Sequence, residues 1–442
     1  MTLNHTHNPA ARSHVASANG HKDFPIQNLP YAMFAPKGQH PKVRAGVAIG
    51  DMVLDLPALK AANLLQGMDA AALEAACQGG GLNAFMAMGP EVWRDLRHAL
   101  FVLLGADAST DIQKTVQACL VAQAEVQYGL PVQVHNYTDF YTSIHHARNV
   151  GSIARPDNPL TPNFQWLPIA YHGRASSVVV SGTDFHRPMG QAMPPGATAP
   201  VYGPCTRLDF ELEMGFYVGT GNAQGTQLKL ENAEDHIFGM CLLNDWSARD
   251  HQFWEMAPLG PFLGKNFCTS VSPWIVTMEA LAPFRTAAVE RPAPEPQPLP
   301  YLDTATNRNS GGIDVQLCVE LDTPQHRKDG KAPSQISRTT FAHQYGTVAQ
   351  MLTQHTVGGC NMLPGDLVGT GTISGPTPDQ AGAIVELSRG GTAPITLGQT
   401  GEQRTFLLDG DSITLRGWCE KQGAARIGFG SCTGTVLPAT AP

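Results

Sequence analysis

The pattern of apolar and polar positions changes near residue 130 and divides the chain into two regions. In the first region, residues 43–56 hold two short apolar runs on either side of Gly50 and Asp51, which predicts a small β-hairpin. Three later segments have the composition of helices, and Pro90 and Ser109 stand where N-terminal helical turns are expected. These segments are residues 68–77, 90–105 and 109–126. We therefore predict a small domain of mixed structure over the first 130 residues.

Beyond Pro131 the chain consists of short apolar runs separated by Gly, Pro and Asn. Runs of this length and composition are typical of strands, so a larger domain dominated by β-structure is predicted. The clearest runs lie at residues 176–182, 211–219, 313–321 and 404–415. Residues 291–300 contain proline too densely for a helix or a central strand, and we expect an extended surface arm that serves either as a spacer or as a docking element.

One of these runs, residues 208–219, alternates acidic and apolar side chains. Asp209, Glu211 and Glu213 fall on one face of an extended segment, because side chains two positions apart in a strand point the same way. A solvated face of an antiparallel sheet explains such a pattern. That explanation is the commoner one, and a hard divalent cation is the alternative, since Ca²⁺ and Mg²⁺ take carboxylate oxygens from more than one segment. The pattern alone leaves both interpretations open.

The composition and charge of the chain limit the classes of function that it can have. The chain has 442 residues, of which 42% are hydrophobic and 15% charged, so it is long enough for two packed units and typical of a globular protein. The formal net charge of −8 argues against nucleic acid as a partner. Nine cysteines without a C-x-x-C pair favour a reducing, cytoplasmic compartment over a disulfide framework.

The sequence offers no candidate for a membrane helix, because no apolar run approaches the roughly 20 residues that spanning requires. The polar N-terminal segment 1–22 also lacks the apolar stretch of a signal peptide. It carries four irregularly spaced histidines, which favours a flexible tail over a metal site. These are His5, His7, His14 and His21.

Three polar clusters have side chains suited to chemistry, and we expect all three to lie on loops. The first holds Asp139 and the adjacent pair His145 and His146, the second holds Asp245 and Arg249, and Lys265 lies in the third. A salt bridge between Asp245 and Arg249 is the plainest interpretation of the second cluster. For either histidine, a core hydrogen bond or an exposed ring is commoner than catalysis. An imidazole oriented by a carboxylate would nevertheless be able to activate water.

Long colinear blocks of this sequence resemble those of fumarylacetoacetases. The blocks run from about Asp23 almost to the C-terminus and include DFPIQNLPY, YTDFY, LPIAYHGRASSVVVSG, RPMGQ, LDFELEM, LNDWSARD, PLGPFLGK, GTISG, TFLLDGD and IGFG. Their irregular composition makes chance or general β-patterning a poor explanation. This resemblance implies a set of metal ligands, a set of catalytic roles and a fold.

The resemblance implies a site for a divalent metal, Ca²⁺ or Mg²⁺, held by four carboxylates. The ligand positions are Asp139, Glu211, Glu213 and Asp245. Lys265 and Thr269 match positions of the metal environment, although a protonated Lys265 is no metal ligand. Asp209 lies outside the ligand set and is interpreted as a neighbouring structural acid.

The resemblance also assigns catalytic and substrate-contacting roles. The histidine that activates water is His146 rather than His145, and its orienting carboxylate is Glu386. Positions that stabilise the developing negative charge are Arg249, Gln252 and Lys265, and positions that contact substrate are Tyr141, Arg155, Tyr171, Gln252, Gly371 and Thr372. The chain departs from the family at Met256, where a substrate-contacting tyrosine is expected, and a thioether cannot donate the phenol's hydrogen bond.

The implied protein is a homodimeric enzyme of the α+β class, mainly β. Its parts are a flexible tail (residues 1–22), a small N-terminal SH3-like β-barrel domain with helices (23–130) and a large C-terminal catalytic domain of sandwich or roll type (131–442). The implied reaction is metal-dependent hydrolysis of 4-fumarylacetoacetate to fumarate and acetoacetate, the last step of tyrosine and phenylalanine breakdown. Alternatives are an acylpyruvate hydrolase, a related diketo-acid hydrolase or decarboxylase, or a noncatalytic metal-binding relative. A serine hydrolase ranks last because the sequence has no G-x-S-x-G motif.

Overall fold

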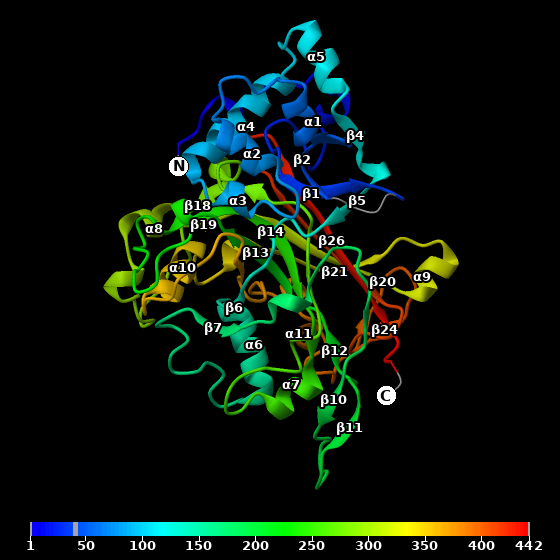
Figure 1. Ribbon diagram of the computed structural model, residues 1–442. Helices are drawn as coiled ribbons and strands as arrows, with labels where there is room; N and C mark the ends of the chain where they lie inside the picture. The colour runs from blue at the N-terminus through cyan, green and yellow to red at the C-terminus, as the bar shows by residue number, and fades with distance from the viewer. Residues whose placement is uncertain (1, 39–42, 441–442) are drawn as a thin grey trace.

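The computed structural model describes residues 2–38 and 43–440, so the ends of the expected tail and catalytic domain, Met1 and residues 441–442, lie outside the described residues. The N-terminal unit, blue to cyan in Figure 1, is built on a five-stranded antiparallel sheet. Its strands, in sheet order, are β4 (Leu120–Ala122), β3 (Met52–Asp55), β2 (Arg44–Ile49), β1 (Tyr31–Pro36) and β5 (Val126–Gly129). The predicted hairpin is confirmed, with Ile49 opposite Met52 across the turn at Gly50 and Asp51.

Five helices accompany this sheet. They are α1 (Leu56–Ala61), α2 (Ala70–Cys77), α3 (Asn83–Met86), α4 (Pro90–Leu104) and α5 (Thr110–Gln117). The first two predicted helices are confirmed, and α4 has Pro90 in its first turn as expected. The third was predicted to run to residue 126, which is wrong, because the helix ends at Gln117 and β4 pairs with β3. Pairing across the sheet overrides the helical composition of this segment.

The N-terminal segment 2–22 does not form the free tail that its composition suggested. It packs against the N-terminal unit through two short 3-10 turns, His5–His7 and Ala16–Ala18. Thr6 and His7 are buried, and the His7 ring contacts the carbonyl of Glu279 in the C-terminal unit at 2.8 Å. Val15 and Ala18 join the core of the N-terminal unit, and hydrogen bonds hold the buried polar residues, which composition alone does not reveal.

Arg97 on α4 fixes this segment, and its removal provides a test of the packing. The buried guanidinium donates to Thr6 Oγ1 and to the carbonyl of Gln27, and lies 3.8 Å from Glu279. We expect Arg97→Ala to lower the free energy of unfolding by about 3–5 kcal/mol, because buried partners are left unpaired. The exposed Arg94 on the same helix is the control, and Arg94→Ala should change stability by less than about 0.5 kcal/mol. Equal urea unfolding curves for the two variants would contradict the prediction.

The C-terminal unit is organised by a mixed eight-stranded sheet that lies beneath the N-terminal unit (Figure 1). Its strands, in sheet order, are β7 (Ile169–His172), β6 (Tyr137–Tyr141), β22 (Leu367–Gly369), β13 (Leu212–Val218), β14 (Ile237–Asp245), β16 (Thr269–Val271) and β8 (Val178–Val180), with β17 (Val276–Thr277) on β14. The central strands β13 and β14 are buried along their whole length. One face joins Tyr31 and Trp93 of the N-terminal unit in a shared core, and the other faces a second sheet.

The second sheet covers the inner face of the first. Its order is β21 (Ser334–Thr340), β20 (Gln316–Asp322), β25 (Ser412–Cys419), β26 (Ile427–Leu437) and β9 (Phe185–His186). Leu242 of β14 shares the core between the sheets with Leu415 and Phe429. Smaller pairs complete the β-structure, namely β10 (Met189–Ala192) with β11 (Val201–Pro204), β12 (Leu208–Asp209) with β15 (Ser247–Ala248), β18 (Arg285–Thr286) with β19 (Gly312–Ile313), and β23 (Ile395–Thr396) with β24 (Gln403–Arg404).

The C-terminal unit also contains several helices, so the prediction of a domain dominated by β-structure is corrected. They are α6 (Ile144–Ala154), α7 (Arg249–Glu255), α8 (Ala305–Ser310), α9 (Pro324–Asp329), α10 (Val348–Thr356) and α11 (Ile384–Leu387). The fold is therefore mixed α/β rather than mainly β, and the SH3-like assignment of the N-terminal sheet stays a prediction. Within the described ranges, none of the helices combines the length and apolar character needed to cross a membrane.

The proline-rich arm lies against the protein rather than standing free. Arg291 donates to the carbonyl of Gln165 at 2.6 Å and its guanidinium lies 4.2 Å from the centroid of the Tyr345 ring. The Tyr345 hydroxyl in turn donates to Glu295 at 3.0 Å. The arm thus contacts the segment that comes after α6, and its role as a spacer or as a docking element stays open.

Candidate metal and catalytic site

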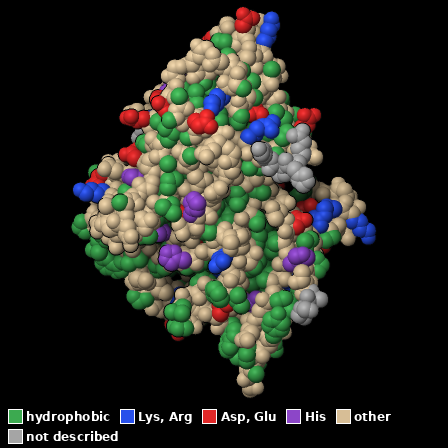
Figure 2. All heavy atoms as spheres, viewed as in Figure 1, with side chains coloured by type: hydrophobic (Ala, Val, Ile, Leu, Met, Phe, Trp, Pro, Cys, Tyr) green, Lys and Arg blue, Asp and Glu red, His purple; other side chains and the backbone are tan. Residues whose placement is uncertain are grey.

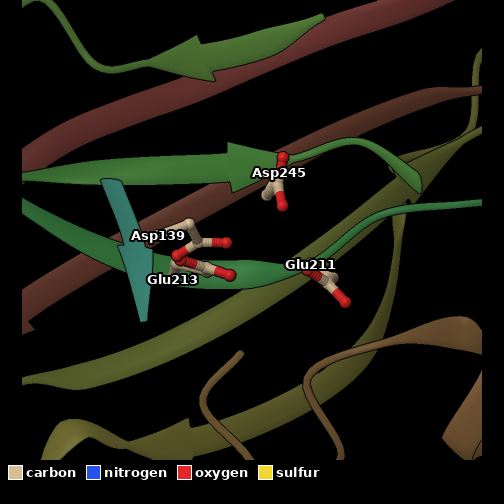
Figure 3. A group of neighbouring side chains, drawn as sticks. All are labelled: Asp139, Glu211, Glu213 and Asp245. Atoms are coloured by element: carbon tan, nitrogen blue, oxygen red, sulfur yellow. The ribbon is translucent and has the colours of Figure 1, made fainter. Parts of the chain in front are cut away.

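Four buried carboxylates meet at the end of the large sheet. Glu213 lies in β13, Asp245 ends β14, Asp139 lies in β6, and Glu211 immediately precedes β13. Each offers an oxygen, and these four oxygens lie within 4.8 Å of one another. Figure 3 shows Asp139 and Glu213 side by side, with Asp245 on the neighbouring strand. The residues from Leu208 to Val218 are all buried, so the acidic face is not the solvated sheet face that the alternation also allowed.

Ionisation is most unfavourable for two of these acids, Asp139 and Glu213. Burial, together with the charges of the other carboxylates, raises the pKa of Asp139 and of Glu213 well above their ordinary values. Asp139 Oδ1 and Glu213 Oε1 are buried and have no hydrogen-bond partner among the described residues. Buried carboxylate oxygens without partners are costly, and coordination to a cation is one way to satisfy them.

Glycine at position 369 makes this close approach possible. A Cβ at Gly369 would lie 2.4 Å from Asp139 Oδ1 and 3.0 Å from Glu213 Oε2, so any side chain there would displace both carboxylates. Gly371 has a φ of +79°, and its N–H donates to Glu213 Oε2 at 3.0 Å. The backbone between β22 and this turn therefore cradles the two acids.

The other two acids face basic groups. Lys265 Nζ contacts Glu211, and lies 2.5 Å from Asp245 Oδ2. Burial would raise the pKa of Glu211, but Lys265 and Arg249 together hold that pKa well below its ordinary value. Burial likewise disfavours the charged Lys265, yet the Asp245 and Glu211 carboxylates raise the pKa of its ammonium above the ordinary value. Lys265 is therefore a protonated neighbour of the cluster.

Asp245 has further partners that differ from the expected one. Its Oδ2 accepts from the Tyr171 hydroxyl at 2.7 Å, and its Oδ1 accepts from Thr269 at 3.3 Å. The alternative salt bridge between Asp245 and Arg249 is not formed, because Arg249 pairs with Asp209 and Glu211 instead. Burial and the Asp245 charge raise the pKa of Tyr171 well above its ordinary value, which keeps the phenol a donor.

The donor set fits a hard divalent cation. All four groups offer carboxylate oxygen, the ligand type that Ca²⁺ and Mg²⁺ take. Asp209, Glu211 and Asp245 form ion pairs with Arg249 or Lys265, whereas Asp139 and Glu213 pair with no basic side chain among the described residues. A divalent ion would favour the ionised forms of Asp139 and Glu213, whose pKa values burial and the neighbouring carboxylates raise.

A histidine and a glutamate stand beside the cluster. His146 lies in the first turn of α6, whose N-terminus is capped by Ser143, and its Nδ1 lies 2.7 Å from Glu386 Oε2. The other ring nitrogen, Nε2, lies 3.9 Å from Glu211 Oε1. With Nδ1–H donating to Glu386, Nε2 is the free acceptor and faces the acidic cluster. The expectation that the polar clusters lie on loops is wrong for His146 and Arg249, which lie on helices α6 and α7, and for Asp139 and Asp245, which lie on strands β6 and β14.

Two residues that the sequence did not single out hold the glutamate. Asn149 donates to Glu386 Oε1 at 2.8 Å, and Ser374 donates to Glu386 Oε2 at 2.9 Å. Burial would raise the pKa of Glu386, but the His146 ring and these donors lower it below its ordinary value. Asn149 lies one turn after His146 on the same helix, a spacing that could have pointed to it. Nothing in the sequence places Ser374 there.

The adjacent histidine is directed elsewhere. His145 is half-buried, and its ring centroid lies 6.0 Å from that of His343. Consecutive residues on a helix do not share a face, so only one of the pair can point at the cluster.

The positions expected to stabilise charge come together on α7 and after it. Arg249 Nη1 lies 2.8 Å from Glu211 Oε1 and donates to Gln252 Oε1 at 3.2 Å. Its Nη2 is buried without a hydrogen-bond partner among the described residues. Asp209, expected to be a structural acid, accepts from Arg249 Nε at 2.8 Å.

The expected substrate positions differ in their degree of burial. Tyr141 is partly buried, with its ring centroid 5.3 Å from that of His146. Thr372 is buried and comes directly after Gly371. Arg155 is exposed at the C-terminus of α6 and donates to the carbonyl of Pro159 at 3.2 Å. Met256 is 40% exposed and follows directly after α7, one turn after Gln252.

A buried oxygen cluster beside an imidazole oriented by a carboxylate is typical of hydrolases that use a metal ion. Comparison with known proteins agrees with this class. The family model "Fumarylacetoacetate (FAA) hydrolase C-terminal" matches residues 135–437, and "Fumarylacetoacetase N-terminal" matches residues 27–131. The chain belongs to the fumarylacetoacetase family.

Relatives from animals and plants match over nearly the whole chain. Fumarylacetoacetase of Rattus norvegicus is 48% identical over 426 residues, covering 95% of this chain and 97% of the relative. The protein of that name from Homo sapiens is 47% identical over 426 residues, with the same coverage. The one from Oryza sativa subsp. japonica is 46% identical over 433 residues, covering 97% of both chains.

Proposed function

We propose that this chain hydrolyses 4-fumarylacetoacetate to fumarate and acetoacetate. The observation that carries the proposal is the match of 46–48% identity to fumarylacetoacetases across both domains. The constellation of four acids and the His146–Glu386 pair supports it. We also keep residues 23–130 and 131–442 as the N-terminal and catalytic domains, supported by family matches to 27–131 and 135–437.

His146 acts as the general base. Glu386 holds the Nδ1 side of the ring, so Nε2 accepts a proton from water on the side of the acidic cluster. The resulting hydroxide attacks a ketone carbonyl of the substrate. The adjacent carbon–carbon bond then breaks, its electron pair leaves with the acetoacetate fragment as an enolate, and a proton restores the neutral carbon.

Donors from α7 and Lys265 stabilise the negative charge that develops. Arg249, Gln252 and Lys265 are held in place by buried partners, so they need little reorganisation during the reaction. A divalent ion, Ca²⁺ or Mg²⁺, bound by Asp139, Glu211, Glu213 and Asp245 would polarise and hold the carbonyl oxygens of a 1,3-dicarbonyl substrate.

Substrate recognition falls to residues around the cluster. The proposed substrate contacts are Tyr141, Tyr171, Gln252, Gly371 and Thr372. Arg155 at the rim suits a terminal carboxylate, because its planar guanidinium can bind two oxygens. The phenol that the family places at position 256 is replaced by the thioether of Met256, so this substrate contact is lost or made by water.

A direct assay tests the proposal. Purified protein with Mg²⁺ or Ca²⁺ should consume 4-fumarylacetoacetate, measured by its loss of absorbance, and release fumarate and acetoacetate in equal amounts. An acylpyruvate and a related diketo acid serve as comparison substrates. A higher kcat/KM for an acylpyruvate than for fumarylacetoacetate would overturn the proposed substrate.

Glu386→Gln tests the orienting role of the carboxylate. His146, Asn149 and Ser374 all donate to Glu386, so an amide would place its NH₂ group against a donor and misalign the ring. We expect kcat to fall by about 10²-fold. Asn149→Ala, which removes one supporting donor and leaves the carboxylate, should cost less than Glu386→Gln. Unchanged turnover of the glutamine variant would remove Glu386 from the mechanism.

We also propose that the protein is a cytoplasmic homodimer. All nine cysteines are unpaired, which suits a reducing compartment.

Exposed apolar side chains gather on α7, the segment after it, and the projecting β10–β11 hairpin at the bottom of Figures 1 and 2. They are Phe253, Trp254, Met256, Leu259, Phe262, Leu263, Val201 and Tyr202. Exposed apolar patches mark interfaces, and light scattering of the purified protein should give twice the mass of one chain.

A further inference from the structure

Asp209 is the acid of the alternating acidic run that neither the metal cluster nor the base uses. It is fully buried, and it lies in β12, which pairs with β15 instead of continuing into β13. Its carboxylate therefore points to a different set of neighbours from those of Glu211 and Glu213. Those neighbours belong to two separate parts of the proposed catalytic apparatus.

Each oxygen of Asp209 accepts from two N–H groups. Oδ1 accepts from the backbone of Phe210 at 2.8 Å and of Ile384 at 2.7 Å. Oδ2 accepts from the backbone of Val385 at 3.1 Å and from Arg249 Nε at 2.8 Å. All four neighbours are donors, so the position requires a group that only accepts, which among side chains of this size is an ionised carboxylate.

Two of these donors open the helix that carries the orienting glutamate. Ile384 and Val385 are the first residues of α11, a helix of four residues that ends at Leu387. Glu386 is the next residue and holds His146. So short a helix has little stability of its own, and its orientation depends on contacts such as those with Asp209.

The fourth donor is Arg249, one of the residues proposed to stabilise the negative charge that develops in the reaction. Arg249 presents Nε to Asp209 and Nη1 to Glu211 and Gln252. With Nε fixed, the planar guanidinium can rotate little, so its buried Nη2 keeps one direction.

We propose that Asp209 is a positioning residue that sets the general base and the charge-stabilising arginine in one common geometry. This inference rests on the proposed function and deepens it, because it names the group that couples the two halves of the reaction. The water-activating imidazole acts at the start of the reaction and the arginine acts as the carbanion forms. One carboxylate links them through the start of α11 on one side and Arg249 on the other.

Asp209→Asn tests the inference with nearly unchanged volume. The amide NH₂ of asparagine would face two N–H donors, so either α11 or Arg249 must move. We expect kcat per folded enzyme to fall by about 10²-fold, the cost of a displacement on the order of 1 Å at a reacting group. Metal content, measured by elemental analysis, should stay equal to that of the parent, because Asp209 is not a ligand.

Asp411 offers a matched control. It too is fully buried and only accepts, with Arg404 Nε at 2.8 Å, Arg404 Nη2 at 3.0 Å and the Leu408 backbone at 2.9 Å. It lies in the turn before β25, in the second sheet. Asp411→Asn should lower the melting temperature about as much as Asp209→Asn while leaving kcat within about 2-fold of the parent. Equal kcat values for the two variants would overturn the inference.

A double-mutant cycle separates positioning from general destabilisation. If Asp209 acts partly through Glu386, Asp209→Asn should cost less in a Glu386→Gln background than in the parent, whereas independent effects would multiply. Full multiplicativity would overturn the link to the base. If Asp209→Asn does not fold, Asp209→Glu keeps the charge but displaces it, and the same loss of kcat is expected. Failure of the parent enzyme to hydrolyse fumarylacetoacetate would overturn the proposed function instead.

Discussion

His146→Ala is expected to lower kcat by about 10³-fold, because it removes the only imidazole of the adjacent pair that faces the acidic cluster. Nε2 of His146 lies 3.9 Å from Glu211, and Nδ1 is held by Glu386. Without the ring, water keeps its proton and is a poor nucleophile near neutral pH. Steady-state kinetics with fumarylacetoacetate measure the loss. Metal content should be unaffected, since His146 is not among the four acids.

The neighbouring histidine provides the control for this prediction. His145 shares the helix and the side-chain chemistry of His146, but its ring lies near His343. His145→Ala should therefore keep kcat within about 2-fold of the parent, as expected for a substitution away from the site. If both variants lose activity equally, α6 has been disrupted and the assignment to one ring fails.

Removal of the divalent ion is expected to abolish turnover and to lower the melting temperature. The ion would neutralise buried carboxylates whose oxygens otherwise lack partners among the described residues, so binding favours the folded state. At a metal concentration about 100-fold above Kd, the linkage contributes about 2.7 kcal/mol, or about 3 °C for a chain of this length. Chelation followed by calorimetry measures the shift. Mg²⁺ or Ca²⁺ should restore both activity and melting temperature, whereas K⁺ should restore neither.

A substitution at a residue that is not itself a metal ligand tests whether the four acids hold the ion. Gly369→Ala would place a methyl group 2.4 Å from Asp139 Oδ1, so the carboxylate must move away from Glu213. We expect loss of bound metal and of turnover. Gly203 in β11 has open space where a Cβ would stand, and Gly203→Ala should retain both. A Gly369→Ala protein with full metal content and activity would show that the four acids do not hold the ion.

Local patterns in the sequence predicted several elements that hold the candidate residues but revealed little of the surroundings of those residues. The alternation of Glu211 and Glu213 predicted a strand, and Pro90 and Ser109 stand at the starts of α4 and α5 as expected. The alternation did not reveal that both faces of the strand are buried, because burial depends on the second sheet and the N-terminal unit. Composition likewise predicted a helix through residues 118–126, where pairing of β4 with β3 decides otherwise.

The amino-acid sequence by itself determined the family, the acids available for a metal, and the helices and strands whose signals are local. Only the tertiary structure decided which groups meet. Strand β22 pairs with β6 and with β13, which brings Asp139 beside Glu213 across Gly369. His146 meets Glu386 across 240 positions of the chain, and Asp209 leaves the acidic face to hold Arg249. Such contacts arise from sheet order and from the packing of distant segments, which no local pattern encodes.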